Sequence, residues 1–394
     1  MPTVPHRPPG SDRLIVTFSD IEMGAGGLHD DFPHSDWFDA LLATYDSLDH
    51  PVDLVLNGDT FDFLKTSVDG VWPRHVTADL ALAKLHRIAE AHPQFFAALR
   101  RFLSVPNRTV AFTVGNHDAE LLFPEVQEAL LGLVDAPMAF PGFAVDLGDA
   151  HFEHGSQSDD MFYMDPADVF VEHEGRRLLR LPWGSVGLLD VAMPLYPLVY
   201  DLDRVKPHAH VLDLLPELRN LLVRAYWRYW TGEYALSAYA GADPLRTMSW
   251  TMLKEVSYRL ITADSNLGSP EHYLKMMEGD AGYRGVVVGH VHEPGLVGRA
   301  DRRLLTTGCL RNEYVIDVAG AVLGPLPKVW GYLWQRDGRT LTSGLQEAYG
   351  PAAPPGHAPS HVRDVLPRIQ HHLATPDEVA SIAVAEQAQR DRER

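Results

Sequence analysis

Six polar side chains of the kind that bind metal ions stand directly after short apolar runs of the sequence. They are carboxylate, amide and imidazole groups, with no thiolate among them: Asp20, Asp59, Asn116, His154, His290 and His292. Such ligands suit Mn, Fe or Zn. They can hold two ions about 3.5–4 Å apart if one carboxylate bridges them, and two such ions would supply hydroxide at neutral pH. Asp59 is the expected bridge, because Gly58 before it allows close backbone approach.

The elements that must position these side chains are short strands. Runs rich in β-branched residues and bounded by glycine predict buried strands at 14–18, 52–57, 109–114, 143–153 and 285–288. Amphipathic helices are expected between the first three, over 37–48 and 81–103. This alternation predicts an α/β domain. In open α/β sheets ligands bind at the carboxyl ends of the strands, where the polar side chains stand here.

The composition is that of an acidic globular protein. The chain has 394 residues, of which 45% are hydrophobic and 22% charged, and its formal net charge is −19. No nucleic-acid partner is expected for so acidic a chain, because phosphates would be repelled. An anionic substrate remains compatible with it, since bound metal ions reverse the local charge.

One cysteine and the N-terminal sequence favour a cytoplasmic location. Cys309 cannot form an internal disulfide, and the N-terminus has no apolar signal region. The most apolar long stretch, 178–200, carries Arg180, Asp190 and three prolines, which argues against a membrane span. Peripheral contact of this stretch with a membrane surface stays open, and so does assembly into an oligomer.

The α/β pattern is interrupted once along the chain. Residues 1–159 form the first part of the expected domain, and 281–350 form the second. Between them, 160–280 is rich in Tyr, Trp, Leu and Arg and predicts a mostly helical inserted cap. Residues 351–394 predict a Pro-rich linker and a helical tail, with Thr375 as the N-cap of the tail helix.

The polar motifs occur in an order that matches a known family. GDTFD (58–62), GNHD (115–118), HG (154–155) and GHVH (289–292) resemble the motifs of the calcineurin-like metallophosphoesterases, over roughly 14–160 and 281–345. The resemblance implies a β-sandwich flanked by helices, with two metal ions at the strand ends. By this resemblance one metal site takes Asp20, Asp59 and His292, and the other takes Asp59, Asn116, His154 and His290.

The resemblance also implies the catalytic side chains. His117 would stabilise the transition state or protonate the leaving oxygen, and Asp118 would orient its ring. Asp62 is expected to serve its loop rather than a metal. Arg311 follows TTGCL (306–310), which resembles the family's late strand and loop near the active site, so it could touch substrate.

The first motif departs from the family pattern. The family usually has Asp-x-His there, whereas this chain has Asp20-Ile21-Glu22. Residues two apart on a strand point to the same side, so Glu22 can still face the metals. A third carboxylate would weaken that ion as a Lewis acid and favour a harder metal such as Mn. The alternative is that Glu22 turns away and that the following loop compensates through His29, Asp30, Asp31 or His34.

The inserted cap offers two further candidates. Arg224 and Arg228 stand four residues apart on a predicted helix and share a face, where they could grip a second phosphate or a lipid headgroup. A solvated helix face is the alternative. The neighbouring aromatic residues, Tyr226, Trp227, Tyr229 and Trp230, are expected in a core or a subunit interface.

These residues predict a dinuclear-metal-dependent hydrolase of phosphoester or pyrophosphate bonds. Hydroxide at two divalent ions, Mn first and Fe or Zn as alternatives, would attack phosphorus in line while His117 assists. The substrate class is a small-molecule or lipid-linked phosphate, either a phosphodiester or a nucleotide-diphospho lipid, because the motif order and the apolar insert resemble bacterial UDP-2,3-diacylglucosamine pyrophosphatases. A non-catalytic metal-binding scaffold on the same fold is the alternative function.

Overall fold

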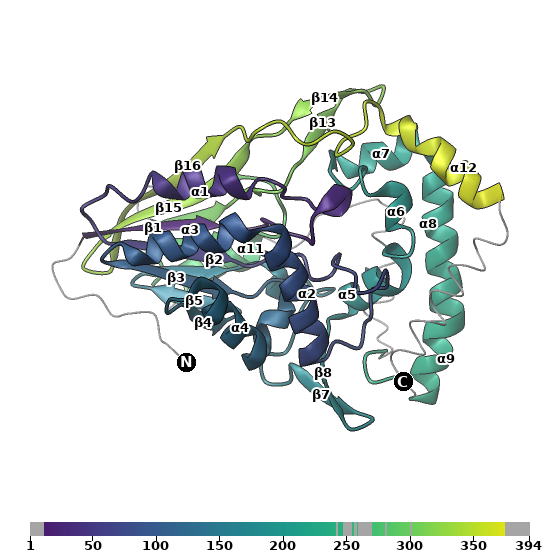
Figure 1. Cartoon of the computed structure of the whole chain (residues 1–394), viewed down its shortest axis with the longest axis horizontal. Coiled ribbons are helices and arrows are strands. Elements are labelled where there is room, and N and C mark those ends of the chain that lie inside the picture. Colours follow the sequence, from purple (N-terminus) through teal and green to yellow (C-terminus); the bar gives the residue numbers. More distant parts are fainter. Residues whose placement is uncertain are drawn as a thin grey trace.

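The protein is a mixed α/β structure built around two large sheets (Figure 1). The computed structural model describes residues 12–241, 243–246, 254–255, 258, 270–279, 282–299 and 302–374. The tail helix expected from Thr375 lies outside these residues. Among the helices of these ranges, none combines the length and the apolar character that crossing a membrane requires.

The larger sheet has six strands and carries three of the predicted ones at its centre. Its order is β16-β15-β1-β2-β3-β4, with β1 to β4 parallel and the β15–β16 hairpin antiparallel to β1. The strands are β1 (Asp12–Phe18), β2 (Val52–Asn57), β3 (Arg108–Thr113), β4 (Ala139–Gly142), β15 (Lys328–Arg336) and β16 (Arg339–Ala348).

The smaller sheet has five strands in the order β11-β12-β10-β6-β5. Its three central strands are parallel, and both edges are antiparallel. The run expected as one strand over 143–153 is a hairpin, because Gly148 turns the chain with a left-handed φ of 66°. The strands are β5 (Ala144–Leu147), β6 (Ala150–Glu153), β10 (Gly285–Val288), β11 (Gly295–Arg299) and β12 (Arg302–Thr306).

The two sheets bury their facing side chains against each other, and helices cover their outer faces. Alternation along the strands sends Ile15 and Val287 into the shared core and the neighbouring Val16 and Val286 toward the helices. Both faces of each central strand are thereby buried, which explains the continuous apolar runs in the sequence. The core between the sheets contains Ile15, Val55, Val145, Leu147, Ala150, Phe152, Val287, Leu305 and Leu333.

Four helices lie on the outer face of the six-stranded sheet (Figure 1). The single helix expected over 81–103 is two helices, because Pro93 lacks an amide hydrogen and begins a new one after His92. On the other sheet, α11 (Pro270–Glu278) packs Tyr273 and Met277 against β10 and β12. The four helices are α1 (Ser35–Ala43), α2 (Ala78–Ala91), α3 (Pro93–Ser104) and α4 (Pro124–Val134). The short η1 (Gly27–His29) lies between β1 and α1, and η2 (Ala119–Leu122) lies between β3 and α4.

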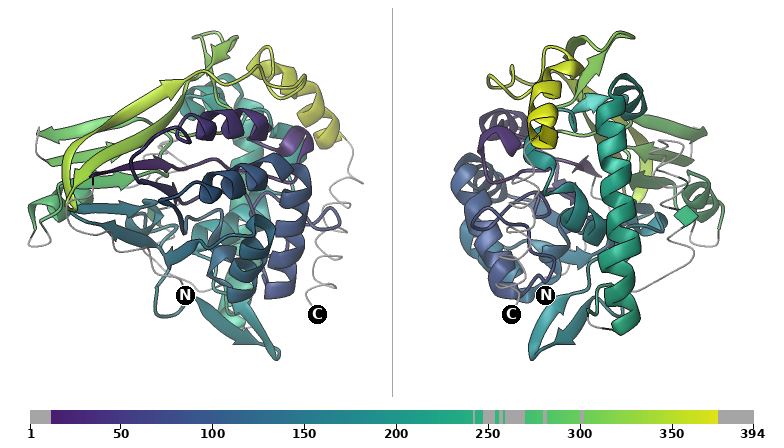
Figure 2. Two further views of the ribbon diagram at one scale, coloured as in Figure 1. Left: turned by 60° about the vertical axis from the view of Figure 1, so that its left-hand side comes forward. Right: turned by 90° about the vertical axis from the view of Figure 1, so that its right-hand side faces the viewer.

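The insert between β6 and β10 is mostly helical in its described part and also contains one hairpin that was not expected. Its helices α8, η5 and α9 run end to end as one rod along a side of the molecule (Figure 2). The elements are η3 (Ser156–Ser158), β7 (Phe170–His173), β8 (Arg176–Leu179), α5 (Trp183–Gly187), η4 (Leu188–Ala192), α6 (Tyr196–Val199), β9 (Val205–Lys206), α7 (His208–Leu214), α8 (Pro216–Arg228), η5 (Tyr229–Tyr234) and α9 (Ala235–Ala240).

The end of the described chain packs on the insert rather than leaving the fold as a linker. Strand β9 pairs with β13 (Tyr314–Ile316), which pairs in turn with β14 (Val322–Pro325). After 351–361, η6 (Val362–Val365) and α12 (Leu366–Ala374) bury apolar side chains against Val205, Val211 and Leu215. This small core ties the insert to the second part of the α/β domain and to the end of the described chain.

Candidate metal centre

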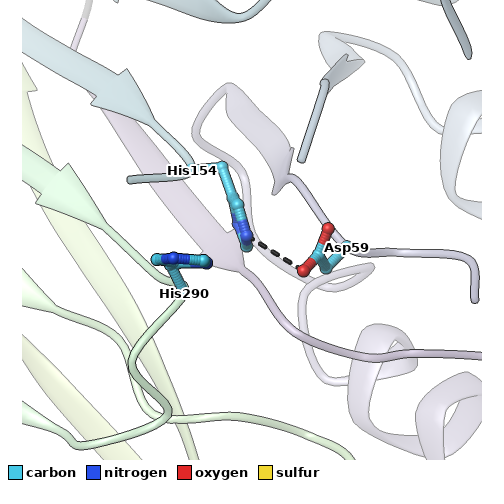
Figure 3. Close-up of side chains that lie close together, drawn as sticks. All are labelled: Asp59, His154 and His290. Atoms are coloured by element: carbon cyan, nitrogen blue, oxygen red, sulfur yellow. Dashed lines mark ion pairs between the residues drawn. The ribbon is translucent and has the colours of Figure 1, made fainter. Parts of the chain in front are cut away.

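The predicted ligands come together at the carboxyl ends of the central strands of both sheets. Asp59 follows β2, His154 follows β6 and His290 follows β10, and one potential ligand atom from each lies within 4.8 Å of the others. Asp59 Oδ2 is 3.0 Å from His154 Nε2, and the ring centroids of His154 and His290 are 5.3 Å apart (Figure 3). All three side chains are buried. This first trio is one candidate cation site.

A second trio lies beside the first and consists of Asp20, Glu22 and His292. His292 Nε2 is 3.2 Å from Asp20 Oδ1 and 3.2 Å from Glu22 Oε1. Asp20 Oδ1 also lies 3.9 Å from Nε2 of His154, so Asp20 connects the two trios. The adjacency is what a two-ion site requires.

Each histidine of the trios is oriented by a partner on its other ring nitrogen. Nδ1 of His292 lies 2.8 Å from Glu313, and Nδ1 of His154 lies 3.1 Å from the backbone carbonyl of Asn57. Nε2 of His290 lies 3.4 Å from Asp159. Carboxylates and carbonyls on the far nitrogen fix the ring and tautomer of metal-binding histidines. The arrangement leaves Nε2 of His292 and His154, and Nδ1 of His290, to face a cation.

Two buried atoms at the centre lack hydrogen-bond partners. They are Oδ1 of Asn116 and Nε2 of His154. Nε2 of His154 lies 3.0 Å from Oδ2 of Asp59 without the geometry of a hydrogen bond. Two atoms that bind the same metal ion would lie close together in this way. Burial would lower the pKa of His154, but Asp59 and Asp20 outweigh it and raise that pKa to about 9. A buried, negatively charged cluster of side chains with two potential metal-ligand atoms that lack hydrogen bonds fits a divalent cation.

The backbone at the strand ends is unusual. Five trio residues adopt the left-handed region, with φ of 53° at Asp20, 52° at Glu22, 50° at Asp59, 72° at His290 and 58° at His292. Non-glycine residues rarely do so, and the conformation costs about 1–3 kcal/mol each. The left-handed turns let five side chains from three loops point into one small volume.

Two glycines allow the loops to approach closely. A Cβ at Gly58 would lie 2.5 Å from the ring of His154, and one at Gly289 would collide with Ser19 and the Asp20 carboxylate. The expectation that Gly58 permits close approach at Asp59 is therefore confirmed.

Glu22 is buried and does not turn away from the centre. Its Oε1 faces His292, while Oε2 accepts hydrogen bonds from Lys65 at 3.0 Å and Arg311 at 2.7 Å. Burial would raise the pKa of Glu22, but Arg311 and Lys65 hold it well below the usual range. Of the four loop residues that could have compensated, Asp30 pairs with His92, Asp31 pairs with Lys65 and Arg204, and His29 packs against Tyr196 and Tyr200. His34 is in none of the candidate cation groups found among the described residues.

His117, the histidine expected to be catalytic, has a different orienting partner from the one expected. Nδ1 of His117 lies 3.0 Å from Asp62, so the prediction that Asp118 orients this ring is wrong. Asp118 instead accepts hydrogen bonds from the backbone N–H groups of Gly115 and Thr60. These two hydrogen bonds stabilise the loop. Burial would lower the pKa of His117, but Asp62 and Asp59 outweigh it and raise that pKa to about 10.

The structure separates the three predicted arginines. Arg311 is buried beside Glu22, at the centre. Arg224 and Arg228 are exposed on α8, where Arg224 donates to the carbonyl of Asn220, and no contact in the described part of the chain joins either to the trios. Of the aromatic residues near them, Tyr229 and Trp230 pack in a core with Trp183 and Tyr234, whereas Trp227 is exposed.

Several residues of the centre were missed by the sequence reasoning. Lys65, Asp159 and Glu313 contact the predicted ligands, and Asp203 of the insert contacts Lys65 and Arg311. No motif or period marks any of them. A comparison of the chain with protein-family models and with curated proteins found no match.

Proposed function

We propose that this protein is a divalent-metal-dependent hydrolase of phosphoester or pyrophosphate bonds. The observation that carries the proposal is the pair of adjacent trios with orphaned donor atoms at the strand ends. Asp59, His154, His290 and Asn116 would hold one ion, and Asp20, Glu22 and His292 the other, with Asp59 or Asp20 shared. Mn is the metal that this oxygen-rich set favours, with Fe or Zn as alternatives.

The bound ions would polarise phosphoryl oxygens and lower the pKa of a water molecule. The chain's own contribution is orientation and proton delivery. His117 is a partly exposed imidazole next to the first trio, with 15% of its side chain accessible, and Asp62 holds its ring. A protonated His117 can donate to the departing oxygen of the substrate. The backbone N–H of His117 donates to Asp59, which keeps the imidazole beside the shared carboxylate.

The first test is metal-dependent hydrolysis by the purified full chain. We expect activity on bis-p-nitrophenyl phosphate with added Mn, which His117→Ala lowers by about 10²–10⁴-fold at unchanged metal content. His86→Ala on the exposed side of α2 is the matched control and should keep full activity. Absence of hydrolysis across phosphodiesters, monoesters and nucleotide-diphospho lipids by a Mn-loaded chain would sink the proposal. Metal binding without turnover would instead favour the scaffold function.

The substrate and location remain proposals of the same kind. A small-molecule or lipid-linked phosphate fits a cation-binding centre in a chain with a net charge of −19, because bound ions locally reverse that charge. A reducing compartment such as the cytoplasm fits the single buried Cys309.

A further inference from the structure

A second group of buried charges lies on the far side of Glu22 from the metal ligands. Lys65 comes from the loop after β2, and Arg311 comes from the loop after β12. Both donate to Oε2 of Glu22, at 3.0 and 2.7 Å, while Oε1 of the same carboxylate is 3.2 Å from His292. One carboxylate of the second trio therefore contacts both this cation pair and His292.

The insert covers the cation pair with one carboxylate. Oδ2 of Asp203 accepts hydrogen bonds from Lys65 and from Arg311, each at 2.8 Å. The side chains of Lys65 and Arg311 are 5% and 4% exposed, whereas that of Asp203 is 35% exposed. The next residue, Arg204, is fully buried and bound to Asp31, so rotation of the Asp203 side chain would uncover the pair without moving the segment.

A metal ion on Glu22 would add positive charge beside this group. The three cations Lys65, Arg311 and Arg204 contact Glu22, Asp31 and Asp203, and two further carboxylates lie near them, Asp62 at 3.4 Å from Lys65 and Glu313 at 3.8 Å from Arg311. Glu22 also belongs to the second trio, so a divalent ion on it would bring two positive charges next to Lys65 and Arg311. A buried charge without compensation is strongly unfavourable. The loaded centre therefore favours one more anion beside Lys65 and Arg311.

Two buried donors of this group lack acceptors. The hydroxyl of Tyr196 has no hydrogen-bond partner, although the residue is only 4% exposed and its ring lies 5.7 Å from Nζ of Lys65. Nε of Arg311 also has none. Buried polar groups are normally hydrogen-bonded, so unpaired donors beside two cations point to an anionic acceptor.

We propose that Lys65, Arg311 and Tyr196 form a subsite for a second phosphate group of the substrate, covered by Asp203 until that group displaces it. The Asp203 oxygen occupies the place of a phosphate oxygen, since guanidinium and ammonium groups bind carboxylates and phosphates alike. Because Glu22 of the second trio directly contacts Lys65 and Arg311, a phosphate joined to the one under attack can reach the subsite. This inference rests on the proposed hydrolase function.

The test separates the subsite from the activity. Isothermal titration of the metal-free chain with inorganic phosphate should show at least about tenfold tighter binding in Asp203→Ala than in wild type, because one cation then lacks its partner. The double variant Asp203→Ala/Lys65→Met should lose that gain. Asp213→Ala, at an exposed position of α7, should bind as wild type does. If Asp203→Ala does not fold, Asp203→Asn, which keeps the shape and loses the charge, replaces it.

Hydrolysis gives the second readout. In the Mn-loaded chain, Asp203→Ala should lower KM for a nucleotide-diphospho substrate and leave KM for bis-p-nitrophenyl phosphate unchanged. Phosphate affinity equal to wild type in both Asp203 variants would overturn the subsite even if the chain hydrolyses phosphodiesters. A gain in phosphate affinity without hydrolysis of any substrate would support the subsite and refute the hydrolase.

Discussion

Saturating divalent metal should raise the melting temperature of this protein by an amount that the two trios set. A ligand at 100 times its dissociation constant stabilises the folded state by about 2.7 kcal/mol per site. With an unfolding entropy of about 2.1 cal/mol/K per residue, the 394 residues give about 0.83 kcal/mol/K. Dividing the stabilisation by this entropy gives a rise in melting temperature of about 3 °C for one ion and about 6–7 °C for two.

The variant that tests this reasoning is Asp59→Asn. Its amide oxygen can still accept the hydrogen bond from the backbone N–H of His117, so the metal-free fold should be retained. Removing one of the carboxylates that converge on the centre also lowers their mutual repulsion. We expect the melting temperature without metal to match or exceed wild type, and the rise on adding Mn to fall to about 3 °C or less.

The assay is differential scanning calorimetry, with and without Mn or Zn after treatment with chelator. Asp213→Asn is the control, since this side chain is 68% exposed and lies on α7. It should keep the full rise. An identical rise in Asp59→Asn and wild type would place the bound ion elsewhere, and no rise in wild type with either metal would refute the reading of the trios as cation sites.

Three further perturbations test other parts of the fold. Lys84→Met leaves the fully buried Glu120 carboxylate without its partner at 3.1 Å, so urea unfolding should show a loss of about 3–5 kcal/mol that Lys84→Met/Glu120→Leu largely restores. Gly289→Ala puts a Cβ against the side chains at the end of β1 and should weaken Mn binding in a titration, whereas Gly132→Ala meets nothing and should not. Burial lowers the pKa of Lys328 to about 8, below the value of about 10.4 in the unfolded chain, so the native state binds fewer protons between these values. The contribution of Lys328 to the free energy of unfolding should therefore rise by up to about 3 kcal/mol from pH 8 to 10.4, so the stability of wild type relative to Lys328→Met should rise by that amount over this range.

The strands and the ligand-bearing loops could be predicted because their signals are local. Apolar runs such as 52–57 and 285–288 are buried on both faces, and the polar residue after each run lies at a sheet edge by geometry. Pairing across the chain has no such signal. The β15–β16 hairpin lies beside β1, with Asp12 opposite Arg336, through contacts more than 300 residues apart in sequence.

The partners of the ligands were not predictable for a related reason. Asp62, Asp159 and Glu313 orient histidines that lie on other loops, at sequence separations of 55, 131 and 21 residues. The positions of these carboxylates depend on how the loops fold over the sheet edge. The spacing of residues along the sequence does not indicate that folding. Pro93 is the opposite case, because this proline marks the break between α2 and α3 in the sequence. The helical periodicity of the apolar residues continues across it, which led to the expectation of one helix.

The left-handed residues at the strand ends link stability to function. Glycine would relieve the backbone cost of about 1–3 kcal/mol at each such position. The chain has glycine directly before three ligand loops, at Gly58, Gly115 and Gly289, yet carries carboxylates and imidazoles at the strained positions themselves. Converging carboxylates add repulsion to that strain. We propose that a bound cation offsets both costs, which would account for carboxylates and imidazoles at five strained positions.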